Sequence, residues 1–169
     1  MNQNPTELLQ DRMALEQLAI EYANAIDRRA WDRLDQVFLP DAIIDYTATG
    51  GIKDSYSEIK AWLPRTMKFF KGYMHLMGNF QFVIEGDTAT GQVACYNPML
   101  APAFLGGSNT VIFGIWYHDT YVRTPEGWRI KTRSQELCYS YNVPLWMRLA
   151  TKLVAPFERY KQSKKQKQV

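Results

Sequence analysis

The sequence has few of the side chains that build metal centres and disulfide frameworks. Its 169 residues include only two cysteines, Cys95 and Cys138, and two histidines, His75 and His118. Neither cysteine has a CxxC partner or a histidine at the spacing of a metal site. This scarcity predicts two buried thiols in a reducing compartment. We also expect a protein that works without a metal or an organic cofactor.

Long apolar runs and a strong excess of one charge are also lacking. No stretch of about 18 apolar residues is present, and no apolar N-terminal run follows a basic region. We therefore expect no membrane span and a cytoplasmic protein. The formal net charge is +3, and much of the excess lies in the C-terminal tail, in Arg159, Lys161, Lys164, Lys165 and Lys167. The body is close to neutral, so no nucleic-acid or membrane partner is expected and the tail is interpreted as a solvated end.

What is present is an ordinary globular composition with many rings. Hydrophobic residues make up 46% of the chain and charged residues 22%, values typical of a single domain with a sizeable core. Aromatic residues make up 14%, which indicates either a large core or an apolar pocket.

Helical patterns come first in the chain. Thr6 is predicted to cap a helix whose apolar face consists of Leu15, Leu18, Tyr22 and Ile26. A short second helix is predicted over residues 30–38, followed by a strand over 42–46. The run Ser55-Tyr56-Ser57-Glu58 is a capping-box pattern for a third helix, which Pro64 interrupts or kinks.

Strand patterns dominate from residue 74 onwards. Strands are predicted over residues 74–85, 88–97, 110–123 and 128–139, and their short links imply antiparallel pairing. Helices followed by a run of strands indicate an α+β domain, assigned to residues 1–142. Residues 143–169 are assigned to a final amphipathic helix, about 144–160, and the basic tail. The apolar loop 98–108 is a pocket flap, a loose hairpin connection or a subunit contact.

Two residues are the main candidates for acid–base chemistry. His75 lies in an apolar run, where a neutral imidazole needs a partner for its N–H and has a pKa suited to a base near pH 7. Asp27 follows the apolar face of the first helix and can orient that imidazole. The alternatives are a structural histidine and a helix-terminal carboxylate paired with Arg28 or Arg29. His118, in a more polar strand, is interpreted as structural.

Other polar side chains accompany this pair. Tyr22 shares the apolar stripe of the first helix, and Tyr46 alternates with Ile44 on its strand, so both hydroxyls are expected among apolar neighbours. Alternation along the strand places Arg133 on the same face as Arg129 and Lys131. That face could be exposed to solvent, which keeps Arg133 out of a pocket unless the strand bends inward there.

The order of these motifs resembles the SnoaL-like branch of the nuclear-transport-factor-two-like superfamily, over about residues 6–142. The motifs are Tyr-Ala-Asn-Ala-Ile-Asp at 22–27, Trp-Asp-Arg-Leu at 31–34, Val37-Phe38 with Pro-Asp-Ala at 40–42, His-Leu-Met-Gly-Asn at 75–79 and Gly-Trp-Arg-Ile at 127–130. The resemblance implies a cone-shaped α+β barrel, with the N-terminal helices packed in a curved, mostly antiparallel sheet.

The same resemblance implies a set of site residues. Scytalone dehydratase, bile-acid dehydratase and lindane dehydrochlorinase use an Asp–His dyad, and Asp27 and His75 fall at matching places. Tyr22 and Tyr46 look like the substrate-oxygen tyrosines of the dehydratases, and Arg133 looks like the pocket arginine of the dehydrochlorinase. The ketosteroid isomerases have their general-base aspartate where this chain has Tyr46, which argues against their chemistry. Substrate binding is assigned to Arg133, Asn97 and Trp116.

The function predicted from these residues is elimination of the dehydratase type. The expected substrate is a small, largely apolar, hydroxylated molecule, like a steroid, a polyketide or a terpenoid. A binding module without catalysis and an isomerase of the same fold remain alternatives. A homo-oligomer, dimer or trimer, is also expected, because the curved sheet is predicted to expose Val111, Ile115 or Val122 on its outer face.

Overall fold

The computed structural model describes residues 4–103 and 107–145. Its helical elements are α1 (Pro5–Asp27), the 3-10 helix η1 (Trp31–Gln36), the 3-10 helix η2 (Thr47–Thr49) and α2 (Tyr56–Met67). Its strands are β1 (Phe38–Asp45), β2 (Lys53–Ser55), β3 (Gly72–Tyr73), β4 (Leu76–Glu85), β5 (Thr88–Pro102), β6 (Ser108–Thr124) and β7 (Gly127–Tyr141). The predicted C-terminal helix lies outside the described residues apart from its first positions, and the separation of residues 143–169 stays a prediction.

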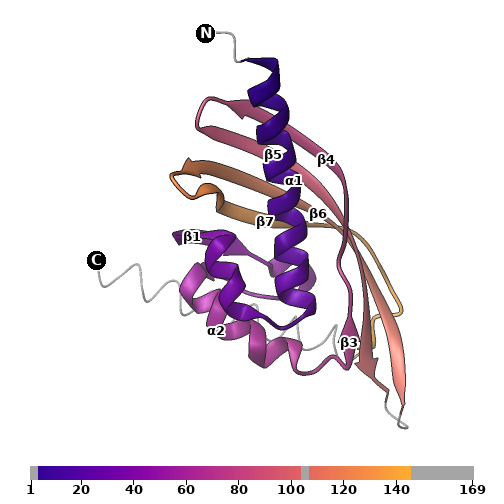
Figure 1. Cartoon of the computed structure of the whole chain (residues 1–169). Coiled ribbons are helices and arrows are strands. Elements are labelled where there is room, and N and C mark those ends of the chain that lie inside the picture. The colour runs from indigo at the N-terminus through magenta and orange to yellow at the C-terminus, as the bar shows by residue number, and fades with distance from the viewer. Residues whose placement is uncertain (1–3, 104–106, 146–169) are drawn as a thin grey trace, which may run out of the picture.

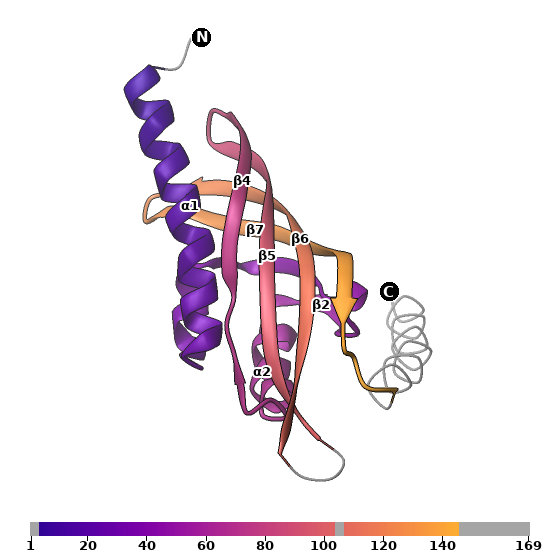
Figure 2. The same cartoon turned by 90° about the vertical axis from the view of Figure 1, so that its right-hand side faces the viewer.

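The strands form one strongly curled sheet that folds around α1. The order is β2-β1-β7-β6-β5-β3, with β4 also paired to β5. Only the β1–β7 contact is parallel among these strand pairs. Figure 1 shows α1 lying in the hollow of the sheet above α2, and Figure 2 shows the long strands β4, β5 and β6 running beside it. The predicted α+β cone with a mostly antiparallel sheet is confirmed.

Helix α1 begins two residues earlier than predicted. The side chain of Asn4, not Thr6, is the cap: its Oδ1 accepts a hydrogen bond from the Thr6 backbone N–H at 3.0 Å, and Pro5 occupies the first turn. Asn is a strong N-cap and Pro fits the first helical position, where its missing N–H is no loss. The predicted apolar face of this helix is buried, as Leu15, Leu18, Tyr22 and Ile26 show.

Three other segments agree in part with their predicted form. Only Trp31–Gln36 of the predicted second helix is helical, and β1 already starts at Phe38, because Pro40 is accommodated at an irregular point of the β1–β7 pairing. Helix α2 runs through Pro64 to Met67. The loop 98–108 is largely a hairpin, since β5 continues to Pro102 and pairs with β6 from Ser108.

The inner face of the sheet follows the alternation of β6. Val111 and Ile115 are 0% and 4% exposed, so the prediction that they lie on the outer face is wrong. They share their parity with Phe113 and Tyr117, which point into the hollow where α1 packs. Val122 is half-buried.

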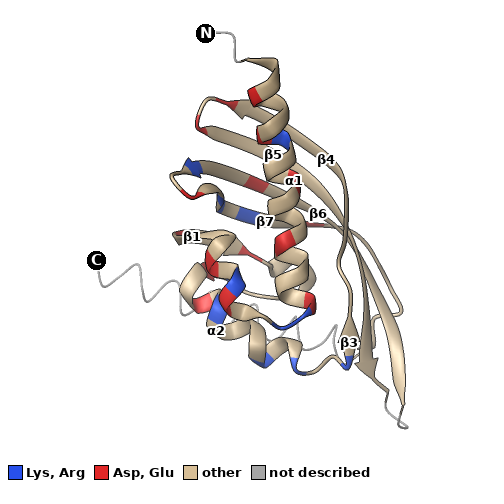
Figure 3. Ribbon diagram, in the orientation of Figure 1, with Lys and Arg blue, Asp and Glu red and all other residues tan. Residues whose placement is uncertain are grey.

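Charge is distributed unevenly over this frame. No Asp, Glu, Lys or Arg occurs between Thr88 and His118, and Figure 3 shows the long arms of β5 and β6 without charged residues. The charged residues lie on the helices, in the turns, on other strands such as β7, and on the last part of β6 from Asp119 onwards. The walls that β5 and β6 give to the hollow are therefore uncharged.

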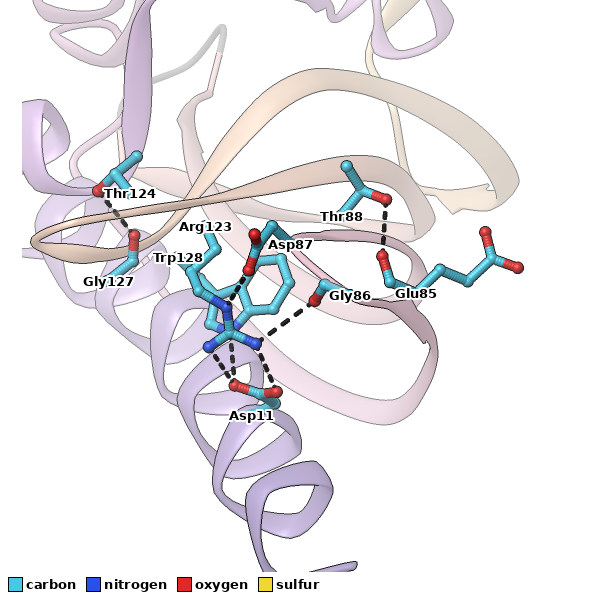
Figure 4. Close-up of polar contacts among 9 residues, drawn as sticks. All are labelled: Asp11, Glu85, Gly86, Asp87, Thr88, Arg123, Thr124, Gly127 and Trp128. Atoms are coloured by element: carbon cyan, nitrogen blue, oxygen red, sulfur yellow. Dashed lines mark hydrogen bonds and ion pairs between the residues drawn. The ribbon is translucent and has the colours of Figure 1, made fainter. Parts of the chain in front are cut away.

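An ionic cluster around the buried Asp11 fixes the N-terminal half of α1 to the sheet (Figure 4). Arg123 donates to both carboxylate oxygens of Asp11 at 2.6 Å and to Asp87 at 2.9 Å. Trp128 Nε1 donates to Asp11 at 3.1 Å, and the Arg123 guanidinium lies 4.5 Å from the Trp128 ring centroid. These four residues, called the Asp11 cluster below, join α1 to the β4–β5 turn and to β6 and β7.

The helices of the described residues include none that is long and apolar enough to cross a membrane.

Candidate functional site

Asp27 and His75 meet at the C-terminal end of α1. Asp27 Oδ1 lies 2.6 Å from His75 Nδ1, and Asp27 Oδ2 accepts the His75 backbone N–H at 2.8 Å. His75 sits in the two-residue link between β3 and β4, not inside a strand as predicted. The side chains are 5% exposed for His75 and 21% for Asp27. Two bonds from one carboxylate to one residue fix both the position and the rotation of the imidazole.

The second imidazole nitrogen of His75, Nε2, faces the side-chain amide of Asn97. Because a carboxylate only accepts hydrogen bonds, Nδ1 carries the proton and Nε2 is left as an acceptor. Asn97 Nδ2 lies 3.1 Å from Nε2 and donates to it. Asn97 Oδ1, also buried, has no hydrogen-bond partner among the described residues. The tautomer of His75 therefore presents a basic nitrogen, covered by a side chain with an unused acceptor.

The end of α1 is held from the opposite side by arginine. Arg29 adopts a left-handed backbone conformation (φ 55°), which ends the helix directly after Asp27 and Arg28. Its guanidinium donates to the Phe70 carbonyl oxygen at 2.9 Å and lies 5.4 Å from the Tyr73 ring centroid. The Tyr73 ring in turn packs edge-on against His75. The predicted alternative, pairing of Asp27 with Arg28 or Arg29, is not what the carboxylate does.

Tyr22 and Tyr46 form the second polar element. Their hydroxyls lie 2.9 Å apart, and both side chains are buried. Burial raises the pKa of each phenol well above its ordinary value, so both stay neutral at physiological pH. Two hydroxyls carry two hydrogens and their mutual bond uses one, so the pair can donate the other to an oxygen.

Both elements line one cavity of about 370 Å³, a size typical of small-molecule sites. Its polar lining includes Tyr22, Tyr46, His75 and Asn97, and its apolar lining includes Ile26, Trp62, Leu63, Met67, Phe69, Phe70, Met99, Phe113 and Ile115. Within residues 4–103 and 107–145, no three His, Cys, Asp or Glu side chains cluster as metal ligands do. Acid–base and hydrogen-bonding groups thus line a cavity that is otherwise mostly apolar.

Sequence reasoning missed the pair Thr49 and Gln135, which also lines the cavity. Thr49 Oγ1 donates to Gln135 Oε1 at 2.6 Å. Thr49 lies in η2 and Gln135 on β7, and no local pattern links positions so far apart in the chain. Tyr117 was missed as well, although its parity with Ile115 on β6 is a signal that points inward.

Arg133 is buried but does not line the cavity. In the β6–β7 pairing Thr120 faces Thr132 and Tyr121 faces Ile130, so Lys131 is an extra, bulged residue. The bulge reverses the side of the strand on which successive residues lie and turns Arg133 to the inside, which is the inward bend that the sequence left open. There it donates to both oxygens of Asp119, at 2.8 and 2.7 Å. Asp119 thus holds the guanidinium that was expected to bind substrate.

Trp116 and His118 lie away from the cavity. Trp116 stands between Ile115 and Tyr117 on β6, so alternation places it on the outer face, and the expectation that it binds substrate does not fit this position. The exposed His118 pairs with Glu136 at 2.8 Å, in keeping with its interpretation as a structural residue. The remaining predicted site residues, Asp27 apart, line the cavity.

A comparison of the sequence with family models decides the relationship. The model of the SnoaL-like domain matches residues 7–134. The chain belongs to the SnoaL-like family. This SnoaL-like protein is 47% identical, over 132 residues, to the uncharacterized protein Rv2910c of Mycobacterium tuberculosis, covering 78% of this chain and 88% of the relative. An uncharacterized protein of Mycobacterium bovis matches equally well.

Solved structures of the same fold are more distant in sequence. The Kfla4162 protein of Kribbella flavida superposes with a TM-score of 0.74 at 23% identity, covering 85% of this chain and 98% of its own. A hexachlorocyclohexane dehydrochlorinase, LinA-type3 of Novosphingobium barchaimii, gives 0.70 at 16%, covering 84% and 96%. A candidate scytalone dehydratase of Novosphingobium aromaticivorans gives 0.69 at 19%, covering 83% and 91%. At these identities the likeness shows the fold alone, the cone-shaped α+β barrel.

Proposed function

We propose that this SnoaL-like protein is a lyase that eliminates water from a small, largely apolar, hydroxylated substrate. A fold shared with dehydrochlorinases and dehydratases supports a lyase-type or isomerase role. The observation that carries the proposal is the Asp27–His75 pair, with Nδ1 held at 2.6 Å and Nε2 facing Asn97, which lines the cavity as His75 does.

The proposed reaction needs one base and one oxygen site. His75 Nε2 takes a proton from a carbon made acidic by a neighbouring carbonyl group, and Asp27 stabilises the imidazolium that forms. Tyr22 and Tyr46 donate to the carbonyl oxygen as it gains charge. The electron pair of the broken C–H bond forms the new double bond as the C–O bond to the hydroxyl breaks. The imidazolium then protonates the departing hydroxide, which leaves as water and restores neutral His75.

Asn97 must yield its place on Nε2 for this to happen. Its amide donates to the nitrogen that has to accept the proton. Its carbonyl oxygen has no hydrogen-bond partner in the described structure, and an unsatisfied buried oxygen is costly. A hydroxyl group on the substrate provides the missing donor. Asn97 is therefore assigned to binding the leaving hydroxyl.

The walls define the expected substrate class. A cavity of about 370 Å³ lined mainly by aromatic and aliphatic side chains suits a compact carbocycle with few oxygen atoms, the class that includes reduced polyketide and terpenoid rings and small steroid fragments. The absence of charged residues from Thr88 to His118, which form the β5 and β6 walls, disfavours a polyanionic ligand.

The test is turnover of a panel of β-hydroxy ketones built on tetralone, decalone and steroid rings. Products are followed by mass spectrometry, which detects the loss of water, and by ultraviolet absorption of the enone. The expected result is dehydration by the parent protein and loss of activity in His75→Ala by several orders of magnitude. His118→Ala is the matched control, because it removes the other histidine from the outer face. Dehydration at the parental rate by His75→Ala would overturn the proposal.

Two observations also suit other functions, a binding module or an isomerase, and the same experiment distinguishes them. The amide of Asn97 on Nε2 also suits a site that binds a ligand and does not react, and the dyad with its tyrosine pair equally suits proton transfer between two carbons. In deuterated water an isomerase would give deuterium incorporation without loss of water. A binding module would give neither, although the ketone would still bind.

A further inference from the structure

A buried ion pair lies directly behind the cavity wall. The side chains of Arg133 and Asp119 are both 0% exposed, and the two hydrogen bonds between them measure 2.8 and 2.7 Å. Asp119 also accepts the Tyr121 hydroxyl at 2.9 Å. Burying two charges is expensive unless every group is satisfied. Yet Nη1 of Arg133 has no hydrogen-bond partner among the described residues.

The partners of this guanidinium are aromatic rings. Its carbon lies 4.1 Å from the ring centroid of Tyr22, 4.3 Å from that of Tyr117 and 5.6 Å from that of Phe38. Tyr22 and Tyr117 line the cavity on their other side. The cation thus lies against two phenol rings that themselves pack edge-on with centroids 5.7 Å apart, and one of them belongs to the Tyr22–Tyr46 hydroxyl pair. A ring face in contact with a cation becomes poorer in electron density, which strengthens its hydroxyl as a donor.

The charge of Arg133 is not cancelled at these hydroxyls. Burial is the largest influence on Tyr22 and raises its pKa, and the Arg133 cation opposes that rise. At Tyr46 burial is likewise the main cause that raises the pKa, and the Arg133 cation lowers this pKa by more than the Asp119 carboxylate raises it. The bidentate pair places the anion beyond the guanidinium, so the wall next to the hydroxyls has a positive potential even though the pair is neutral as a whole.

We propose that Arg133 is a positioning and polarising residue: held by Asp119, it acts through the ring of Tyr22 to make the Tyr22–Tyr46 pair a site for a ligand oxyanion. The proposal rests on the proposed function only in taking these hydroxyls as the site of the ligand oxygen. It assigns the arginine no contact with substrate. The favoured ligand has an enolate or phenolate oxygen on an apolar ring, and the matching neutral ligand binds less well.

The experiment measures binding, so it requires no turnover. The probes are 4-nitro-1-naphtholate, which is anionic at neutral pH, and its methyl ether, which is neutral. The ratio of the two dissociation constants, measured by absorbance or calorimetry, is the anion preference. The parent protein is expected to favour the naphtholate.

Two variants are expected to shift this ratio in opposite directions. Arg133→Met combined with Asp119→Leu removes both charges without leaving one unpaired, and should lower the anion preference by about tenfold while the ether binds as before. Asp119→Asn removes only the anion and leaves the cation, so the preference should rise. If the double variant does not fold, the anion preference of Asp119→Asn still tests the inference, because a preference at or below that of the parent would contradict it.

The matched control is Arg123→Met with Asp11→Leu. It removes a second bidentate Arg–Asp pair, which lies in the Asp11 cluster, outside the cavity lining. Its anion preference should equal that of the parent. Equal losses for both probes in the Arg133 variant, an unchanged ratio, or a parent protein that does not distinguish the probes would each overturn the inference. A failure of His75→Ala to affect turnover would instead count against the dyad alone.

Discussion

The two ends of α1 use the same side chain in opposite ways. Near the N-terminus, Asp11 is matched by Arg123 and Trp128, a permanent cation and a fixed N–H donor. At the C-terminal end, Asp27 is matched by a backbone N–H and by an imidazole. The first carboxylate lies in a closed cluster, and the second adjoins a cavity of about 370 Å³.

The difference lies in the partner, not in the carboxylate. Arginine keeps its proton at every accessible pH, so Asp11–Arg123 can only hold elements together. Histidine exchanges its proton near neutrality, so the same geometry at Asp27 leaves a group that can accept and return one. One helix thus fixes the domain at one end and orients a candidate base at the other.

The largest expected effect is a loss of activity on changing Asp27, at the C-terminal end of α1. Asp27→Asn keeps the size of the side chain but removes the charge that stabilises the imidazolium and sets the tautomer. On a substrate found by the panel assay, kcat should fall by roughly 10²–10⁴-fold. Circular dichroism should show an intact fold. Parental kcat in this variant would mean that Asp27 is as structural as Asp11.

A change in the Asp11 cluster, near the other end of α1, should affect stability and not activity. Arg123→Met removes the cation beside the buried Asp11 but leaves the Trp128 N–H donor, and the loss of one partner of a buried acceptor costs about 1–3 kcal/mol of unfolding free energy. Urea unfolding measures this loss. At a temperature where the variant is folded, turnover per folded molecule should match the parent. A large fall in kcat with unchanged stability would contradict the division between the ends.

A smaller effect is expected from the oxygen site beside Asp27. Tyr46→Phe removes one hydroxyl from the pair with Tyr22, and kcat/KM should fall by about 10² because one donor to the charged oxygen is lost. The methyl ether of the naphthol probe should bind as it does to the parent. If kcat/KM is unchanged, the tyrosine pair is core packing and not an oxygen site.

The smallest expected effect is in the pH dependence of stability. The hydrogen bonds from Arg123 are the main cause that lowers the pKa of Asp11 below its ordinary value. A lowered folded-state pKa stabilises the fold above the ordinary carboxyl pKa, and this contribution is lost as the pH falls through the folded pKa. The parent should therefore exceed Asp11→Asn in urea midpoint at pH 7, and the gap should narrow below about pH 4. A constant gap from pH 7 to pH 3 would refute this.

Much of the site was predictable because its members carry strong individual signals. His75 is one of only two histidines, Tyr22 is a polar residue in an apolar stripe, and Asp27 ends that stripe. The β6–β7 hairpin and the buried face of α1 follow from turns and periodicity. Family resemblance added the pairing of Asp27 with His75, which lie far apart in the chain.

The rest depended on geometry that no local pattern records. The bulge at Lys131 shifts parity by one residue, and that single residue decides whether Arg133 meets water or Asp119. Trp116 was placed in the pocket, although Ile115 and Tyr117 occupy the inner positions beside it. The contact of Thr49 with Gln135 arises only when η2 and β7 come together.

The most direct test is which imidazole nitrogen of His75 carries the proton. Long-range ¹H–¹⁵N NMR of the imidazoles measures this without a known substrate. The free protein should show the proton of His75 on Nδ1, with Nε2 unprotonated. Saturation with 4-nitro-1-naphtholate should shift the Nε2 signal, while His118 on the outer face stays unchanged. A proton on Nε2 in the free protein, or a His75 signal indifferent to the bound ligand, would contradict the claim that this imidazole is a base facing the cavity.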